Sequence, residues 1–335
     1  MPKKVGITIG KFMPLHLGHK HMIDTALDTL DHLIVIVSGS EDDEIPLSER
    51  RFDLFAEYFF KDKIYVVKHI DDSPTPKNIN KNGTVLDEDY QDYWIRVFRQ
   101  YKVTHIVSSD MYGKTLAERM GVRWFPVDPK RELYPISGTE IRKNPTKNFH
   151  MLTETAKRRY MKTVAIVGPE SVGKSTITKR LADEFQGIAI PEYGRSITEV
   201  KENLDKEDFD HIFQVQDSMI RRAQKSLRYP LVVSDTEALV TYVYGKIYLN
   251  TSLYDELDSV LKNQHIDLYI LMAPTVQWVD DGSRVMSNDE ERWWFFSQMI
   301  ELLISNKKNY VIIYKSDDYE ERYEMAKSAV QELIG

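Results

Sequence analysis

The chain reads Gly168-Pro-Glu-Ser-Val-Gly-Lys-Ser-Thr176 immediately after the apolar run Thr163-Val-Ala-Ile-Val167. The first stretch has the spacing G-x-x-x-x-G-K-[ST] and lies where a buried strand gives way to a helix. Loops of this kind surround phosphate oxygens with backbone N–H groups. From average composition, a chance match in a chain of this size is on the order of 1%. The stretch therefore predicts an α/β fold with a nucleotide phosphate site at the end of a strand.

Individual positions of this phosphate loop have predicted roles. Gly168 and Gly173 let the backbone approach the phosphates closely. Lys174 is expected to bind the β- and γ-phosphates, and the Ser175 hydroxyl is expected to bind Mg²⁺. The predicted ATP-binding residues are Gly168, Glu170, Ser171, Gly173, Lys174, Ser175 and Thr176. The loop by itself indicates nucleotide binding and leaves the reaction open.

Three features outside the loop favour a kinase, and the third is the charged segment Trp278–Arg284 described below. The apolar run Leu231–Ser234 ends in Asp235 about 60 residues after the loop. A carboxylate in that position binds metal or activates an acceptor hydroxyl, and the alternative is an N-cap for the next helix. Glu192 and Arg195 follow the apolar run Ile188–Ile190, where small-molecule kinases hold the acceptor.

A charged segment, Trp278-Val-Asp-Asp-Gly-Ser-Arg284, lies between an expected strand and an expected helix. It fits a mobile lid that excludes water and brings Arg284 to the transferring phosphoryl group. Arg292 is a second candidate for that role. A charged surface loop is the alternative for the whole segment.

Both halves of the chain alternate apolar runs with helical patterns, which predicts parallel sheets covered on both faces. We expect domains at 1–150 and 162–335, a boundary near Met161, and a long surface loop over Asp71–Asp87. The expected strands are Val5–Ile9, Leu33–Val37, Ile64–Val67, His105–Val107, Trp124–Val127, Thr163–Val167, Leu231–Ser234, Leu268–Met272 and Val311–Tyr314. The expected helices are Lys20–Leu30, Ser48–Phe60, Tyr90–Tyr101, Lys114–Met120, Ser175–Phe185, Asp205–Leu227 and Asp318–Ile334.

The loop after the first strand carries a second nucleotide signature, Gly10-Lys-Phe-Met-Pro-Leu-His-Leu-Gly-His19. Gly10 can adopt backbone angles closed to other residues, so that the chain can pass close to a phosphate. His16 and His19 are three residues apart at the entry to a helix, so both imidazoles can face one side. With the N–H groups of the helix start, they predict a triphosphate site whose α-phosphorus is attacked. The alternative is two surface histidines.

This signature resembles the H-x-G-H nucleotidylyltransferase superfamily, which transfers a nucleotidyl group and releases pyrophosphate. A late basic motif of that superfamily is similar to Ile136-Ser-Gly-Thr-Glu-Ile-Arg142 here. The resemblance implies that Ser137 and Thr139 cap a helix start that accepts phosphate, and that Arg142 neutralises the β- or γ-phosphate. The implied ATP-binding residues are Gly10, Lys11, Phe12, Ser137 and Thr139, with His16, His19 and Arg142 as catalytic residues.

Trp94 lies on the expected helix before the fourth strand. A Trp on an amphipathic helix is most often a core residue. The alternative, which we favour, is a stacking plate for a cationic nicotinamide ring, because indole has the strongest cation–π face. Similarity to nicotinamide-mononucleotide (NMN) adenylyltransferases implies such a Trp in this region and an arginine, Arg50, that clamps the NMN phosphate; an exposed helix arginine is its alternative. The implied NMN-binding residues are Ser38, Arg50, Trp94, Ser109 and Asp110.

The order and spacing of these motifs over essentially the whole chain resemble the NadR-type bifunctional NMN adenylyltransferase/ribosylnicotinamide kinase family. Further similarity lies in Val127–Arg131, Glu192–Arg195 and Asp235-Thr236. The resemblance implies two doubly wound parallel-sheet domains, an N-terminal Rossmann-like transferase and a C-terminal P-loop kinase. The kinase would convert ribosylnicotinamide and ATP to NMN with Mg²⁺ as cofactor. The transferase would join NMN to a second ATP, giving NAD and pyrophosphate.

The chain departs from that family in two places. Some members begin with a helix-turn-helix repressor domain, whereas the first catalytic strand here starts by Val5, so we expect no such domain and no operator binding. The kinase strand often reads D-T-D, but this chain has Asp235-Thr236-Glu237, which leaves the role of Glu237 open.

Composition limits the remaining classes. The 335 residues include no cysteine, which excludes disulfides and thiolate chemistry, and the net charge of −7 argues against a nucleic-acid binder. With no signal peptide and no membrane-spanning run, we expect a cytoplasmic protein. Its expected partners are ATP, NMN, ribosylnicotinamide and NAD, with no nucleic acid and no membrane. A homo-oligomer remains open.

Two other functions remain to be separated from this one. A fused phosphopantetheine adenylyltransferase/dephospho-coenzyme A kinase would use the same two modules, but Trp94, Val127–Arg131 and Trp278–Arg284 favour the nicotinamide substrate. A non-catalytic sensor of NAD and ATP is the alternative from a different class. Lys174 and Asp235 argue against it, because a sensor needs neither phosphoryl-transfer group.

Overall fold

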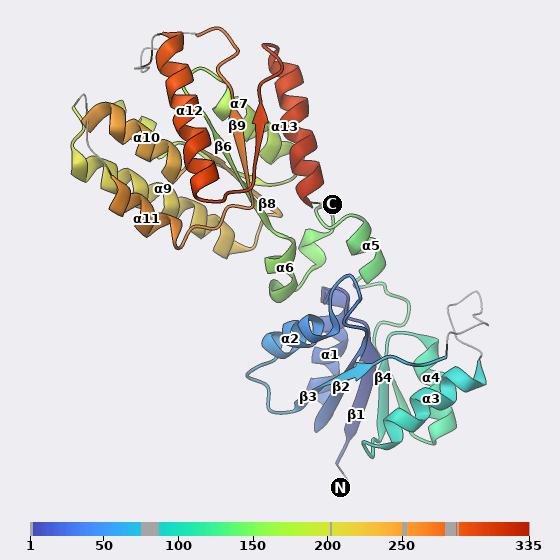
Figure 1. Ribbon diagram of the computed structural model, residues 1–335. Helices are drawn as coiled ribbons and strands as arrows, with labels where there is room; N and C mark the ends of the chain where they lie inside the picture. The colour runs from blue at the N-terminus through green and yellow to red at the C-terminus, as the bar shows by residue number, and fades with distance from the viewer. Residues whose placement is uncertain are drawn as a thin grey trace. The chain divides into compact units, whose positions relative to one another are not determined.

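The computed structural model describes residues 3–74, 87–201, 203–249, 253–278, 286 and 288–334 (Figure 1). The chain divides into two compact units, Met1–Arg159 and Tyr160–Gly335, beside the expected boundary near Met161. Each unit is an α/β structure with a parallel five-stranded sheet, so the expected fold class is confirmed. Most of the expected loop Asp71–Asp87 and of the charged segment Trp278–Arg284 lies outside the described residues.

The sheet of the first unit has the order β3-β2-β1-β4-β5. The central strand, β1, pairs in parallel with β2 on one side and with β4 on the other. A loop that leaves β1 at its carboxyl end therefore enters the crevice where ligands bind in such sheets. The strands are β1 Val5–Gly10, β2 His32–Gly39, β3 Ile64–Ile70, β4 His105–Ser108 and β5 Arg123–Pro126, at the places that the apolar runs predicted.

Helices cover both faces of this sheet (Figure 1). The helices of this part of the chain are α1 Leu17–Thr29, α2 Leu47–Glu57, α3 Glu88–Arg99, α4 Met111–Met120, α5 Gly138–Lys143 and α6 Glu154–Tyr160, with a 3₁₀ turn η1 at Phe149–Met151. Of these, α1 and α2 pack on one face of the sheet, and α3 and α4 pack on the other. Successive residues of a strand point to opposite faces. Val35 accordingly joins a buried cluster with α1 and α2, whereas Ile36 joins one with α3 and α4.

The sheet of the second unit has the order β10-β9-β6-β8-β7, and all its strands are parallel. The strand that carries the phosphate loop, β6, is central, between β8 and β9. The strands are β6 Lys162–Val167, β7 Ile188–Ile190, β8 Leu231–Asp235, β9 Leu268–Met272 and β10 Tyr310–Ile313. The helices are α7 Lys174–Glu184, α8 Tyr193–Thr198, α9 Lys206–Ser226, α10 Ala238–Leu249, α11 Tyr254–Leu261, α12 Asp289–Ser305 and α13 Tyr319–Ile334.

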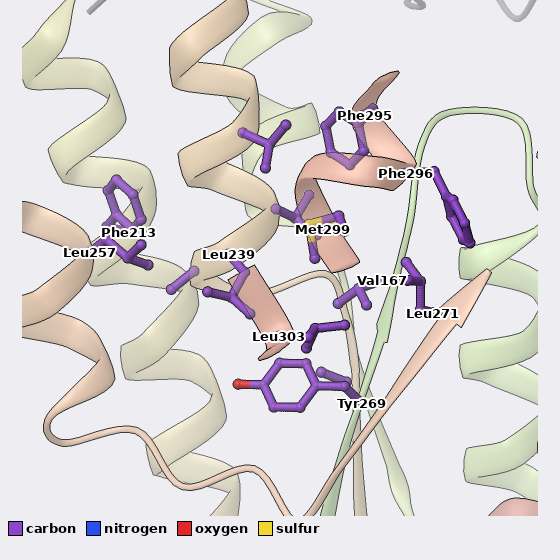
Figure 2. Close-up of a cluster of buried hydrophobic side chains, with 14 of the residues drawn as sticks. Val167, Phe213, Leu239, Leu257, Tyr269, Leu271, Phe295, Phe296, Met299 and Leu303 are labelled. Atoms are coloured by element: carbon purple, nitrogen blue, oxygen red, sulfur yellow. The ribbon is translucent and has the colours of Figure 1, made fainter. Parts of the chain in front are cut away.

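The second sheet also has a buried cluster on each face. Residues of α7 and α13 pack on one face, and residues of α9 to α12 pack on the other. Figure 2 shows part of the larger cluster, in which Met299 and Leu303 of α12 and Leu239 of α10 lie near Val167 and Leu271 of the sheet. The phosphate loop, at the end of β6, therefore lies between two layers of helices.

The sequence analysis did not predict α10 and α11. Six of the twelve residues of α10 are buried, and its apolar residues surround the helix. A helix that is apolar on most sides lacks the one-sided 3.6-residue pattern by which a surface helix is recognised. None of the described helices combines the length and the apolar character that a bilayer crossing requires.

Candidate active sites

The first candidate site lies in the loop that leaves β1. Gly10 does not take a left-handed backbone, whereas Phe12 does, with a φ of 47°, and the role of Gly10 in ATP binding stays a prediction. A Cβ at position 10 would lie 3.2 Å from the Phe12 ring, so a side chain there would crowd that ring. Phe12 is itself 1% exposed and contacts His19 edge-on, with ring centroids 4.8 Å apart. It supports His19 from the core rather than presenting a face to ATP.

His16 and His19 lie side by side at the start of α1. Their imidazole rings stack with centroids 3.7 Å apart and an interplanar angle of 25°. The Nδ1 atom of each ring is buried without a hydrogen-bond partner among the described residues. Since buried polar atoms are normally paired, two adjacent unpaired nitrogens are candidates for binding a ligand. The alternative of two exposed surface histidines is excluded.

The electrostatic environment keeps both imidazoles neutral. Burial, followed by the cation of Arg131, lowers the pKa of His16 to about 4. Burial, followed by His16 and Arg131, lowers the pKa of His19 well below its ordinary value. At neutral pH the two rings can therefore act on phosphate oxygens as N–H donors, while Arg131 supplies positive charge.

The late basic stretch packs against the loop after β1. A Cβ at Gly138 would lie 2.5 Å from the carbonyl oxygen of Met13, so the close approach of α5 needs a glycine. Arg142 Nη1 donates a hydrogen bond to that same carbonyl oxygen. Ser137 and Gly138 line a pocket of about 120 Å³ that His16 and His19 also line. The fold thus brings together two motifs that lie at opposite ends of the first unit's sequence.

The polar groups of the late stretch already have protein partners. Ser137 caps α5, as expected: its Oγ accepts a hydrogen bond from the backbone N–H of Glu140 at 3.2 Å. Thr139 is exposed in the first turn of α5. Arg142 Nε pairs with Glu44 at 3.0 Å and does not line the pocket. For Arg142 to bind a phosphate, the phosphate would have to replace Glu44, so its catalytic role stays a prediction.

Arg50 differs from the expected NMN-phosphate clamp. It is 1% exposed, and its Nη1 donates to the carbonyl oxygens of Lys11 at 2.8 Å and Ser38 at 3.0 Å. Its Nη2 donates to the carbonyl oxygen of Ser40 and pairs with the carboxylate of Asp43. Both terminal nitrogens are thus occupied by the loops after β1 and β2. The structure differs from the expected clamp and also from its alternative of an exposed helix arginine, and it makes Arg50 the residue that positions these loops.

Trp94 also differs from the expected stacking plate. It is 1% exposed, belongs to the core cluster with α3 and α4, and lies with its ring centroid 5.2 Å from that of His69. The core alternative therefore holds. Asp110 caps α4 by accepting a hydrogen bond from the backbone of that helix, and Ser109 lines the pocket beside the histidines. Ser109 is the one predicted NMN-binding residue in that pocket lining.

Arg131 and Tyr134 also line this pocket, although the sequence analysis assigned them no role. Asp128 and Arg131 take left-handed φ values of 44° and 54°. The Asp128 carboxylate accepts hydrogen bonds from the backbone N–H groups of Glu132, Leu133 and Tyr134. This sharp loop brings Arg131 close enough to the histidines to lower their pKa values. The similarity in Val127–Arg131 was a signal that could have indicated it.

The second candidate site is the phosphate loop between β6 and α7. Gly168 has a φ of 140°, and a Cβ there would lie 2.5 Å from the carbonyl oxygen of Met272. Gly173 is the N-cap of α7 with a φ of 86°. Both glycines are therefore required by the backbone, as expected. Ser171, between them, also takes a left-handed φ, of 60°.

A pocket of about 260 Å³ opens on this loop. The loop residues Glu170–Thr176 form one wall, so all but Gly168 of the predicted ATP-binding positions line it. Lys174 Nζ donates to the carbonyl oxygen of Pro169 at 2.8 Å, which holds the ammonium group over the loop. The opposite wall includes Glu192, Arg195, Gln216, Phe209, Tyr244 and Tyr248.

Two carboxylates lie in this pocket with different environments. Burial raises the pKa of Glu192, against the opposite effect of Lys174, and Arg195 Nη2 pairs with its Oε2 at 3.5 Å. Glu170 accepts hydrogen bonds from the Tyr244 hydroxyl at 3.4 Å and from the backbone N–H of Met286 at 3.0 Å. The expected acceptor residues Glu192 and Arg195 thus face the phosphate loop across one pocket.

Asp235 lies at the end of β8 and is buried. Its Oδ1 has no hydrogen-bond partner within the part of the chain that the structure describes. The alternative role as an N-cap is taken by Glu237, whose carboxylate accepts from the backbone N–H of Leu239 at 3.0 Å. Burial raises the pKa of Glu237 to about 7. The structure therefore assigns Glu237 to the start of α10 and leaves Asp235 available to a ligand.

The predicted lid arginine, Arg284, lies outside the described residues. The second candidate, Arg292, is 1% exposed on α12. Its Nη2 donates to the carbonyl oxygen of Val276 at 3.1 Å, and its Nη1 pairs with Asp289 at 3.0 Å. Arg292 is therefore a buried anchor for the segment after β9, and the expectation that it meets a phosphoryl group is contradicted.

Each of the two units matches a known protein family or domain. Residues 7–144 match the cytidylyltransferase-like family, and residues 163–322 match an AAA domain. The chain is similar to the trifunctional NAD biosynthesis/regulator protein NadR of Escherichia coli (strain K12) and of Salmonella typhimurium (strain LT2). Each is 26% identical, over 99% of this chain and 84% of the relative.

Two solved structures are similar over the whole chain. A crystal structure of a NadR protein in complex with NR has a TM-score of 0.60 and 24% identity, and covers 100% of this chain and 97% of that chain. A NadR protein in complex with NAD and AMP-PNP has a TM-score of 0.60 and 22% identity, and covers 99% of this chain and 97% of the other. At these identities the two structures establish the likeness of the fold.

Proposed function

This chain is homologous to NadR, and from that premise we propose that it is a bifunctional enzyme of NAD biosynthesis. The second unit phosphorylates ribosylnicotinamide with ATP to give NMN. The first unit joins NMN to the adenylyl group of a second ATP to give NAD and pyrophosphate. The observation that carries the proposal is the presence of two separate pockets, each beside the loop that leaves the central strand of one parallel sheet.

The first unit supports adenylyl transfer by the character of its histidine pair. In this reaction an NMN phosphate oxygen attacks the α-phosphorus of ATP, and pyrophosphate leaves. Negative charge increases on the α-phosphate oxygens as the bonds change. The neutral rings of His16 and His19 can donate N–H groups to these oxygens, and Arg131 adds a fixed cation beside them.

The acceptor pocket of the second unit fits a pyridinium nucleoside. Tyr244 and Tyr248 provide aromatic surface, and Glu170 provides negative charge beside it. A cationic ring is stabilised by both, whereas a neutral base gains only the stacking. Glu192 and Arg195 supply an acceptor and a donor for ribose hydroxyls. The pocket therefore favours ribosylnicotinamide as the acceptor.

The residues at the phosphate loop fit a Mg²⁺ ion. The Asp235 carboxylate has a buried oxygen with no partner among the described residues, and the Ser175 hydroxyl lines the pocket. Mg²⁺ prefers such oxygen donors and takes its remaining ligands from water and phosphate. The described ranges contain no group of three His, Cys, Asp or Glu side chains that could hold a metal alone. When bound, Mg²⁺ neutralises charge on the β- and γ-phosphates.

The chain's own residues then account for the positioning of the phosphoryl transfer. The N–H groups of the phosphate loop and the start of α7 bind the phosphate oxygens. Lys174, now bonded to Pro169, can exchange that carbonyl oxygen for a phosphate oxygen. Glu192 and Arg195 hold the nucleoside on the far wall, so that its 5′-hydroxyl meets the γ-phosphate.

One incubation tests the proposal. The purified protein with ribosylnicotinamide and Mg-ATP is expected to yield ADP, NMN, NAD and pyrophosphate, resolved by chromatography. Phosphorylation of dephospho-coenzyme A, with none of ribosylnicotinamide, would support the fused coenzyme A enzyme. No ADP or pyrophosphate with any nicotinamide precursor would support the sensor. A cytoplasmic location, the absence of nucleic-acid binding and the oligomeric state remain predictions.

A further inference from the structure

A half-exposed tyrosine lies directly against the phosphate loop. Tyr319 is the first residue of α13, and a Cβ built at Gly173 would lie 3.0 Å from its ring. The ring therefore packs on the backbone of the loop's last glycine. Tyr319 is nevertheless 49% exposed, so a large part of its surface is free to contact a ligand bound on the loop.

A buried arginine fixes the start of α13 to the loop. Arg322 is fully buried, and its Nη2 donates to the carbonyl oxygen of Ala273 at 2.9 Å and to that of Val172, within the phosphate loop, at 3.4 Å. Its Nη1 donates to the carbonyl oxygen of Ser316, in the turn before α13, at 3.2 Å. One side chain thus connects the phosphate loop, the end of β9 and the turn that carries Tyr319.

Contacts on the surface hold the same helix end in place. The guanidinium group of Arg180, on α7, lies 3.5 Å from the centre of the Tyr323 ring and pairs with Glu320 at 2.7 Å. The Asp318 carboxylate accepts a hydrogen bond from the backbone N–H of Glu320 at 2.7 Å, which caps α13. Tyr319 is therefore an exposed ring on a fixed backbone, and little conformational freedom is lost when a ligand stacks on it.

Tyr319 lies on the opposite side of the loop from the acceptor pocket. That pocket is lined by residues of α8, α9 and α10 and by none of the described residues of α13. In Figure 1, α9 and α10 lie on one side of the second sheet, and α7 and α13 lie on the other. A triphosphate on the loop has its γ-phosphate towards the acceptor, so its nucleoside end leaves on the other side.

We propose that Tyr319 is the residue on which the base of ATP stacks in the kinase site. The inference deepens the proposed kinase function and rests on it only in that the phosphate loop binds ATP. An aromatic ring stacks on any purine, so Tyr319 supplies affinity for the base without reading its hydrogen-bonding edge. It is a specificity residue for nucleotides over ligands that present phosphates alone.

Binding of ATP and of inorganic tripolyphosphate to the full-length chain tests this. Tripolyphosphate has the same phosphate contacts and no base. Lys174→Ala identifies the binding component that belongs to the phosphate loop. In that component, Tyr319→Ala is expected to weaken ATP about tenfold, as loss of one stacked base does, and to leave tripolyphosphate unchanged. Tyr319→Phe keeps the ring and should bind ATP like the unmodified chain.

Trp293→Ala is the matched control, because Trp293 is a similarly exposed ring, at 46%, on α12. It should leave both ligands unaffected. Equal losses for ATP and tripolyphosphate in Tyr319→Ala would overturn the inference, and so would unchanged ATP affinity. The test needs no acceptor. A chain that binds ATP through Tyr319 but phosphorylates no ribosylnicotinamide would refute the proposed function alone.

Discussion

Arg50 on α2 holds the loop that leaves β1, since its Nη1 donates to the carbonyl oxygen of Lys11 at 2.8 Å. The same guanidinium group bonds to the carbonyl oxygens of Ser38 and Ser40 in the loop after β2. Two loops at the carboxyl end of the sheet are thus fixed by one buried side chain. The histidine pair at the start of α1 follows the first of these loops, so its position depends on Arg50.

Arg50→Met should therefore destabilise the first unit. The change removes the Arg50 donor from the carbonyl oxygens of Lys11 and Ser38, whereas the Ser40 oxygen keeps the backbone N–H groups of Asp43 and Leu47. An unsatisfied buried group costs about 1–3 kcal/mol, so we expect a loss of about 3 kcal/mol in unfolding free energy. Chemical denaturation measures it. Arg51→Met is the control, because Arg51 is exposed on the same helix. If Arg50→Met has wild-type stability but a raised KM for NMN, the result would instead support a role for Arg50 in binding the NMN phosphate.

The buried state of His16 predicts a pH dependence. Its pKa is about 4 in the folded chain, against an ordinary value of 6.5. Between these two values the unfolded chain binds more protons, so the unfolding free energy of the first unit should fall as pH drops from about 6.5 to 4. At 1.36 kcal/mol per pKa unit, the loss approaches roughly 3 kcal/mol. Denaturation at pH 7 and pH 4 measures it.

Substituting His16 isolates its contribution to the pH dependence of the unfolding free energy. His16→Asn should reduce the slope of stability against pH, whereas His150→Asn should not, because His150 is exposed in the same unit. Equal slopes in the two variants and the unmodified chain would show that His16 titrates normally and is accessible to protons.

His19→Ala and Lys174→Ala should separate the two activities. His19→Ala removes a donor to the transferring phosphate and is expected to lower the adenylyltransferase kcat by about 10²–10³-fold while sparing the kinase. Lys174→Ala should do the reverse, because Lys174 lies on the phosphate loop of the other unit. Each activity is assayed separately, with NMN or with ribosylnicotinamide. Loss of both activities from either change would mean that the units do not act independently.

Those parts of the fold and of the sites that depend on residues close together in the sequence could be predicted from the sequence alone. Apolar runs identified the strands, and the phosphate loop has its chemistry within nine consecutive residues, so local pattern sufficed. Arg50 and Trp94 were placed wrongly because their positions are set by packing between elements far apart in the sequence. A helix arginine or tryptophan has the same local pattern whether it faces a ligand or the core.

The features that the local sequence pattern did not predict also depend on tertiary structure. Arg131 approaches the histidines only because a turn with two left-handed residues redirects the chain. Arg322 is distant in sequence from the loop that it holds. The helix α10 is buried on most sides and has no polar face to mark its period.

Glu237→Gln should stabilise the second unit above neutral pH. The folded pKa of about 7 lies above the ordinary value of 4.5, so the folded chain binds more protons between these values. Stability should therefore fall as pH rises from about 4.5 to 7, by roughly 3 kcal/mol. A neutral amide can still accept from the N–H of Leu239 and removes this dependence. Denaturation at pH 5 and pH 8 compares the two chains, and parallel pH profiles would contradict the raised pKa.

The acceptor pocket leads to a further prediction, which concerns charge rather than shape. Tyr244 lines the pocket, and its hydroxyl donates to Glu170, so ring and carboxylate act on the same space. Tyr244→Leu should raise the KM for ribosylnicotinamide about tenfold, because a desolvated cation–π contact contributes up to about 2 kcal/mol. Tyr244→Phe keeps the aromatic face and should change the KM little. The KM for ATP should be the same in both variants, since ATP binds on the loop.

Glu170→Gln tests the electrostatic part of the same pocket. Glutamine keeps one oxygen for the backbone N–H of Met286, and its NH2 group can donate to the Tyr244 hydroxyl oxygen, but the change removes the negative charge. Affinity should fall for the cationic ribosylnicotinamide and stay constant for its reduced, uncharged dihydro form, measured by competition in the kinase assay. If both forms lose affinity equally, Glu170 acts by positioning the pocket wall, and selectivity for the pyridinium cation must come from the aromatic residues alone.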